Sequence, residues 1–170
     1  ISDTIRKVVQ GTKFNEEMHP LTDVYLYAAS RAQTLSTIVK PTVDAGGIVI
    51  ADRSYITSLA IQGGAQKQGI ETVLSVNEKA IETVTPDLVI YLYMDPTSSM
   101  HRTFDEDGDK WESKTTEFNY EIAKGYDVAA ELPSLKKIWN RIDIDKSMDI
   151  PSVAEMVWQV VEPLVTTISQ

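Results

Sequence analysis

The segment from Gly46 to Gly63 constrains the fold of this chain more than any other. The paired glycines at 46–47 tolerate backbone angles that are closed to other residues, and they mark a turn. The apolar run at 48–51 is rich in β-branched side chains, which is typical of a strand buried on both faces of a parallel sheet. From Tyr55 the pattern predicts a helix that ends at Gly63–Gly64. The segment therefore predicts a strand, a turn and a helix in an α/β fold.

Asp52 and Arg53 follow this predicted strand directly. In open α/β sheets, ligands bind outside the carboxyl ends of the strands. A guanidinium suits phosphate because its planar donors can bind two oxygens at once, and a carboxylate can orient a metal or its water. Ser58 and Gln62, four residues apart on the predicted helix, share a face and could point at one ligand. The alternative is a structural Asp-Arg ion pair, and the pair alone does not decide between the two.

The remaining chain alternates further helices with further strands. Helices are predicted from Ser2 to Gly11, from Pro20 to about Ala45 with a kink or restart at Pro41, from Ile70 to Thr83, from about Ser113, and through Val153 to Pro163; strands are predicted at 88–93 and around 138–142. Strands separated by helices favour right-handed βαβ units and a parallel sheet.

Composition limits the classes of function. The net charge of −9 argues against a nucleic-acid-binding surface, and a small anionic substrate would need local Arg or Lys. The chain has no cysteine, which excludes disulfides and thiol catalysis. No apolar run approaches the length of a membrane span and no signal-peptide pattern opens the chain, so we expect a single-domain cytoplasmic protein of 170 residues without a membrane partner.

Tyr27 and Arg31 lie one turn apart on the helix predicted from Pro20. An aromatic ring and a guanidinium at this spacing could hold a base and a phosphate. Alternatively, Tyr27 is a core residue and Arg31 extends to solvent or to a carboxylate.

Five collinear stretches resemble the thymidylate kinase family. Asp52-Arg53-Ser54 followed by Ser58-Leu59-Ala60-Ile61-Gln62-Gly63 resembles its Asp-Arg-(Tyr/His) and Ser-x-Ala-Tyr-Gln-Gly motif; the others are 26–33, 86–92, 109–126 with its Asp-Lys-Trp-Glu, and the C-terminal strand and helix at 142–163. The resemblance spans nearly the whole chain.

The resemblance implies a three-layer P-loop kinase-type α/β fold, with a parallel sheet flanked by helices, that phosphorylates dTMP with ATP and Mg²⁺, commonly as a homodimer. It implies roles that are carried over residue by residue: Tyr27 stacks on thymine, Arg31 and Arg53 hold the acceptor monophosphate, Ser58 lines the monophosphate pocket, Gln62 reads the base edge, and Asp52 acts beside Arg53 in catalysis near the metal, through water. A lid at about 97–116 would supply Arg102, Lys110 or Lys114 to the transferring phosphate.

Two departures from the family pattern leave alternatives open. The chain contains no Gly-x-x-x-x-Gly-Lys-(Ser/Thr) loop, and because the family places that loop upstream, we expect an N-terminally truncated kinase domain. Ile61 and Ser54 replace the family's Tyr and its Tyr or His in the acceptor region. The alternatives are therefore a kinase of another (deoxy)nucleoside monophosphate, or a non-catalytic nucleotide-binding module without a P-loop.

Overall fold

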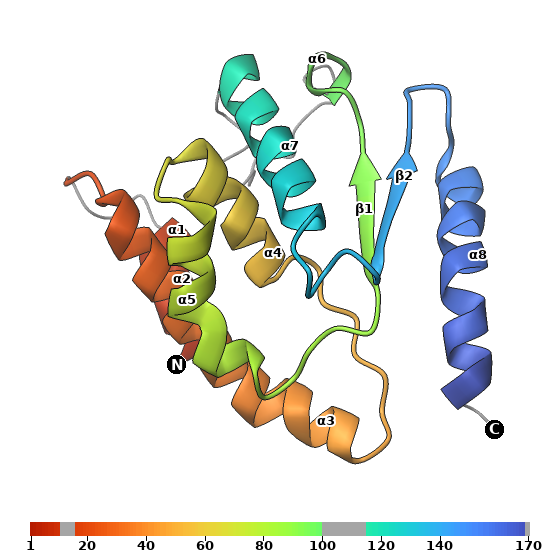
Figure 1. Cartoon of the computed structure of the whole chain (residues 1–170), viewed down its shortest axis with the longest axis horizontal. Coiled ribbons are helices and arrows are strands. Elements are labelled where there is room, and N and C mark those ends of the chain that lie inside the picture. The colour runs from red at the N-terminus through yellow and green to blue at the C-terminus, as the bar shows by residue number, and fades with distance from the viewer. Residues whose placement is uncertain (11–15, 100–114, 169–170) are drawn as a thin grey trace. The chain divides into compact units, whose positions relative to one another are not determined.

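The computed structural model describes residues 1–10, 16–99 and 115–168 (Figure 1). The chain divides into two compact units, one formed by Ile1–Thr85 with Glu106–Ala129 and the other by Pro86–Asp105 with Ala130–Gln170. The organisation of the chain as a single domain stays a prediction.

The regular elements of the first unit are all helical among its described residues. Its elements are α1 (Ser2–Gln10), α2 (Pro20–Thr34), the π-helical segment η1 (Leu35–Val39), α3 (Lys40–Asp44), α4 (Tyr55–Ser58), the π-helical segment η2 (Leu59–Ala65), α5 (Ile70–Ile81) and α7 (Thr116–Ala130). Helices α1 and α5 both pack against α2 (Figure 1). Apolar side chains from α2, η2 and α5, among them Val24, Leu59 and Val73, are buried together in its core.

The long helix predicted from Pro20 to about Ala45 is confirmed, with a change of winding at its centre. The Pro20 ring occupies the first turn, and Nδ1 of His19 accepts a hydrogen bond from the N–H of Leu21. Segment η1 then leads into Pro41, and the N–H of Lys40 donates to the carbonyl of Leu35, five residues earlier. Because proline has no N–H, a widened turn before it helps the helix to continue.

Helix α7 approaches η2 more closely than side chains normally allow. A Cβ added to Gly125 would lie 2.6 Å from the carbonyl oxygen of Ala60 and 2.7 Å from its Cα. Glu121 on α7 pairs with Lys67 just beyond η2, and Lys124 binds the same carboxylate at 2.6 Å. A glycine at position 125 is therefore what permits this backbone-to-backbone packing.

The second unit contains the two strands predicted at 88–93 and around 138–142. Strand β1 (Val89–Tyr93) pairs in parallel with β2 (Trp139–Asp143), with Val89 opposite Trp139 and Tyr93 opposite Asp143 (Figure 1). The parallel pairing confirms the predicted parallel sheet, and the right-handed βαβ connection stays a prediction. The short helix α6 (Pro96–Ser99) follows β1, and α8 (Ile150–Ile168) contacts β2.

Several predicted boundaries differ from the structure, including that of α5, which ends at Ile81 rather than at Thr83. The helix predicted to end at Gly63–Gly64 runs to Ala65, because a π-helical turn carries it past the glycines. Helix α7 begins at Thr116 rather than at about Ser113. Helix α8 continues past Pro163 and ends at Ile168. A proline removes one backbone N–H donor, and the other hydrogen bonds of the helix can remain.

The strand predicted at 48–51 is wrong in this structure. These residues form no strand, and Ile48 and Ile50 are 58% and 93% exposed. A strand exists only where a neighbour completes its hydrogen-bond ladder, and among the described residues β1 and β2 pair only with each other. The apolar pattern of Ile48–Ala51 indicates that these residues favour the β conformation, but it does not specify which strand they would pair with.

Within the described parts of the chain, no helix combines the length and the apolar character that crossing a bilayer requires.

Candidate functional site

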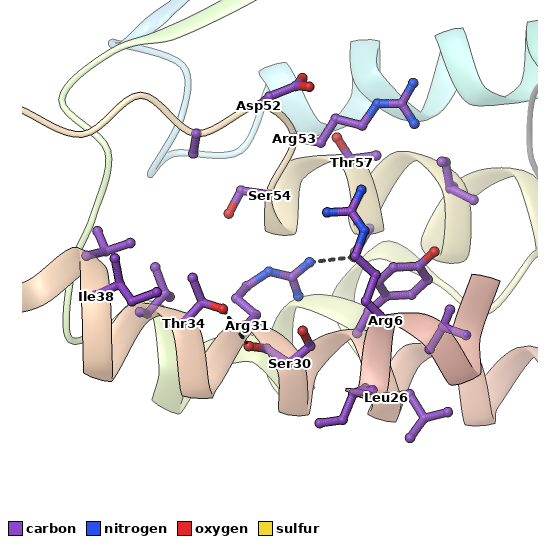
Figure 2. A pocket seen from close by; sticks show the side chains of 18 of the residues that line it. Arg6, Leu26, Ser30, Arg31, Thr34, Ile38, Asp52, Arg53, Ser54 and Thr57 are labelled. Carbon is purple, nitrogen blue, oxygen red and sulfur yellow. Dashed lines mark hydrogen bonds between the residues drawn. The ribbon is translucent and has the colours of Figure 1, made fainter. Parts of the chain in front are cut away.

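An open pocket of about 750 Å³ lies in the first unit (Figure 2). Its walls come from α1, α2, η1, residues 49–54, α4 and η2. The six predicted site residues outside the lid all line it: Tyr27, Arg31, Asp52, Arg53, Ser58 and Gln62. The predicted lid residues Arg102, Lys110 and Lys114 lie outside the described residues. The volume is in the range of roughly 300–1,000 Å³ that is usual for small-molecule sites.

Arg31 is fixed in this pocket by neutral partners from two other helices. Its Nη2 donates to Oγ of Ser58 on α4 at 2.9 Å, and its Nη1 donates to Oδ1 of Asn77 on α5. Burial lowers the pKa of Arg31 to about 10, against weaker raising effects of Tyr27 and Tyr55. The guanidinium therefore remains charged at neutral pH, and neither hydrogen-bond partner neutralises it. From the sequence, the alternative is that Arg31 extends to solvent or pairs with a carboxylate. In the structure it donates instead to the neutral side chains of Ser58 and Asn77.

Arg53 has an unusual backbone conformation. Its φ is +62°, in the left-handed region that non-glycine residues rarely adopt. Such strain is concentrated at functional sites, where the surrounding structure maintains it. Figure 2 shows Asp52, Arg53 and Ser54 on the loop across the pocket from Arg31. The strained turn thus carries the predicted Asp-Arg pair to the pocket wall.

Ser58 and Gln62 share a face, as their four-residue spacing predicts. Both are buried, with 4% and 2% of their surface exposed, and both line the pocket. Ile61, which replaces the family's tyrosine, is also a buried lining residue. This wall therefore presents an amide and a hydroxyl beside an apolar side chain.

Positive charge predominates among the pocket's charged residues. The ionised side chains that line it in the described residues are those of Arg6, Arg31, Arg53 and Asp52. The whole chain has a net charge of −9, so this grouping of three arginines is local and specific to the pocket. It meets the requirement, stated from composition, that an anionic substrate needs a local cationic site.

The family model for thymidylate kinase matches residues 1–153. The chain belongs to the thymidylate kinase family. The thymidylate kinase of Anoxybacillus flavithermus is 35% identical over 169 residues, which cover 97% of this chain and 78% of the relative. That of Finegoldia magna is 35% identical over 150 residues, covering 88% and 72% of the two chains.

A solved structure agrees with this assignment at the level of the fold. The crystal structure of thymidylate kinase from Ehrlichia chaffeensis matches with a TM-score of 0.70 at 22% identity, covering 94% of this chain and 73% of that one. The three-layer α/β P-loop kinase-type class predicted from the sequence is thereby confirmed.

Arg6 and Asn77 were not predicted from the sequence as residues of the candidate site. Arg6 on α1 lines the pocket, and its Nε donates to Oε1 of Gln10 at 3.1 Å. Asn77 on α5 holds Arg31 from behind the pocket wall. The signal for Asn77 was a polar residue within the apolar pattern of its helix, whereas nothing in the sequence connects Arg6 to Arg31.

Proposed function

We propose that this protein transfers the γ-phosphate of ATP to dTMP and that the pocket binds the dTMP. Membership of the thymidylate kinase family supports the reaction, and the local positive charge of the pocket supports an anionic nucleotide as the ligand. In the reaction an oxygen of the dTMP phosphate forms a bond to the γ-phosphorus, and the bond to the leaving ADP breaks.

The observation that carries this proposal is the half-buried charge of Arg31, which only neutral groups hold. A cation partly withdrawn from water is costly unless an anion compensates it, and the two hydrogen-bond partners of Arg31, Ser58 and Asn77, are neutral. A bound nucleotide monophosphate would supply the missing negative charge. We therefore propose that Arg31 and Arg53 hold the acceptor phosphate from opposite sides of the pocket.

The other lining residues have roles that suit the rest of the nucleotide. Tyr27 would stack on the thymine ring, the amide of Gln62 would bind the base edge, and the hydroxyl of Ser58 would line the phosphate end. These residues bind and orient the acceptor. In phosphoryl transfer, positioning and charge stabilisation account for nearly all of the catalysis.

Mg²⁺ is compatible with the pocket as a substrate-bound ion. No group of three or more His, Cys, Asp or Glu side chains that could hold a metal occurs in the part of the chain that the structure describes. Mg²⁺ with nucleotide phosphates commonly uses one or two carboxylates and keeps several waters. Asp52 is the lining carboxylate that fits this pattern, and we propose that it acts through water. When bound, the ion would neutralise charge on the ATP phosphates.

A coupled ADP-release assay on the full-length protein tests the reaction. With ATP and Mg²⁺, we expect the highest kcat/KM for dTMP among dTMP, dUMP, UMP, CMP and AMP. A higher value for another acceptor would contradict dTMP as the substrate and would favour a kinase of a different nucleoside monophosphate. ATP-independent binding of dTMP without turnover would favour the nucleotide-binding module instead.

We also propose a homodimer in the cytoplasm, which rests on the family resemblance and on the substrates. Sedimentation equilibrium of the purified protein tests the dimer, and a mass that stays monomeric across the concentration range would contradict it.

A further inference from the structure

Asn77 is a fully buried amide, at 0% exposure, with a hydrogen bond at each end. Its Nδ2 donates to the carbonyl of Val73 at 2.7 Å, one turn earlier on α5. Its Oδ1 accepts from Nη1 of Arg31. Reversing the amide would set its NH₂ against the donors of the guanidinium and its oxygen against a carbonyl oxygen, so these two contacts fix one orientation.

This contact completes the support of the Arg31 side chain. Arg31 lies on α2, Ser58 on α4 and Asn77 on α5, so three helices meet at one guanidinium. A long arginine side chain loses considerable rotamer freedom when it is held in one place. The acceptors on Ser58 and Asn77 already restrict the side chain in the protein without ligand. The loss of rotamer freedom therefore does not weaken ligand binding, and the site is preorganised.

The chemical type of the acceptor matters as much as its position. A carboxylate at position 77 would also accept a hydrogen bond from the guanidinium, but it would neutralise the charge of the guanidinium. The amide oxygen orients the same N–H group and leaves the charge uncompensated. Asn77 is not itself among the pocket-lining residues, so it can act on a ligand only through Arg31.

We propose that Asn77 is a positioning residue that directs the Arg31 guanidinium toward the acceptor nucleotide while leaving its charge for that nucleotide. This inference rests on the proposed function of the pocket. According to this inference, the affinity for the acceptor nucleotide depends on a side chain that does not contact the nucleotide.

The isosteric variant Asn77→Asp tests the proposal in the full-length protein. Titration calorimetry with dTMP should give a Kd raised by about tenfold or more, the scale of one charge-assisted hydrogen bond. The KM for ATP should stay within about twofold of wild type. The melting temperature without ligand should fall, because an aspartate oxygen replaces the Nδ2 donor and faces the Val73 carbonyl, so melting does not decide the question. A merely structural asparagine would change dTMP affinity and the KM for ATP together. The same change at half-buried Asn140 on β2 is the matched control and should leave the dTMP affinity unchanged.

A second variant keeps the test decisive if Asn77→Asp does not fold. Asn77→Ser retains a hydroxyl that can donate to the Val73 carbonyl, but it is too short to reach Arg31. Its dTMP affinity should also fall while the KM for ATP is kept. Wild-type affinity for dTMP in a folded Asn77 variant would overturn the role of Asn77 alone. A wild-type protein that binds no dTMP would instead overturn the proposed function beneath it.

Discussion

The phenol oxygen of Tyr126 lies 2.9 Å from Oγ1 of Thr57, and this contact joins helix α7 to the helix that follows the Asp52–Arg53 turn. Burial raises the pKa of Tyr126, so the phenol keeps its proton at neutral pH and the hydrogen bond is retained. The side chain of Thr57 also lines the pocket. The packing of α7 is therefore connected to the pocket wall through this hydrogen bond.

Tyr126→Phe should destabilise the protein by about 1 kcal/mol, because it removes this hydrogen bond and leaves the ring in place. Urea unfolding measures the change in the free energy of unfolding. Tyr25→Phe is the matched control, since Tyr25 is 56% exposed, and it should leave stability unchanged. Equal stability of the wild-type and Tyr126→Phe proteins would show that the contact contributes nothing.

Arg53→Lys should lower kcat/KM for dTMP roughly ten- to hundredfold, because lysine keeps the charge and loses the planar pair of donors, a difference of about 1.5–3 kcal/mol. Steady-state kinetics with dTMP varied at saturating ATP measure this. Arg141→Lys on β2 makes the same exchange in the other unit and should leave kcat/KM unchanged. If Arg53→Lys retains wild-type kinetics and the full dTMP-induced rise in melting temperature, Arg53 has only a structural role.

Arg53→Gly should separate function from stability at the same position. Glycine adopts φ of +62° without steric cost, whereas a side chain there costs about 1–2 kcal/mol. We therefore expect the free energy of unfolding to be maintained or raised, while dTMP affinity measured by calorimetry falls at least as far as in Arg53→Lys. Loss of stability in Arg53→Gly would mean that contacts of the side chain outweigh the backbone strain.

Gly125→Ala should destabilise the protein by about 1–3 kcal/mol, because the added methyl group overlaps the backbone of Ala60 and forces α7 away from η2. Urea unfolding measures the effect. Adding Ala60→Gly should not restore stability, because the close atoms of Ala60 belong to its backbone. Rescue by that second change would show that the contact depends on the Ala60 side chain.

Acid should weaken the attachment of α7 through Glu121. Hydrogen bonds and charge from Lys124 and Lys67 lower the pKa of Glu121 to about 2, from 4.5. A carboxyl whose folded-state pKa is depressed stabilises the fold above its unfolded pKa, and that contribution is lost as pH falls through the folded value. The stability difference between wild type and Glu121→Gln should therefore be constant above about pH 5 and shrink between about pH 4.5 and 2. Urea unfolding across this range measures it, with the exposed Glu155→Gln on α8 as control. A difference independent of pH would contradict the prediction.

Local patterns predicted those parts of the fold that depend on neighbours in the sequence. The helix from Pro20 and the strands at Val89 and Trp139 carry their own periodicity, and each is present. The segment Ile48–Ala51 carries an equally strong strand pattern and forms no strand, because a ladder needs a partner that local sequence does not specify. The π-helical segments were likewise not predictable, since they differ from an α-helix by a shift of one hydrogen-bond acceptor.

The site was predictable where a motif kept its spacing. Asp52, Arg53, Ser58 and Gln62 lie within one short stretch, and the structure brings them to one pocket together with Tyr27 and Arg31. Their individual roles stay predictions. The contact of Asn77 with Arg31 could not be predicted, because it joins residues that are 46 positions apart in the chain.

The two π-helical segments give the pocket a sensitivity to chain length. Both η1 and η2 contribute lining residues, among them Ile38 and Gln62. Each π turn accommodates roughly one residue more than an α-helical turn, and one residue of an α-helix corresponds to about 100° of rotation. Removing a single residue from η2 would restore ordinary winding and turn one end of the helix relative to the other. For this wall of the pocket, a one-residue deletion would therefore be more damaging than most substitutions, and natural variation in these two segments should favour exchanges of residues over gaps.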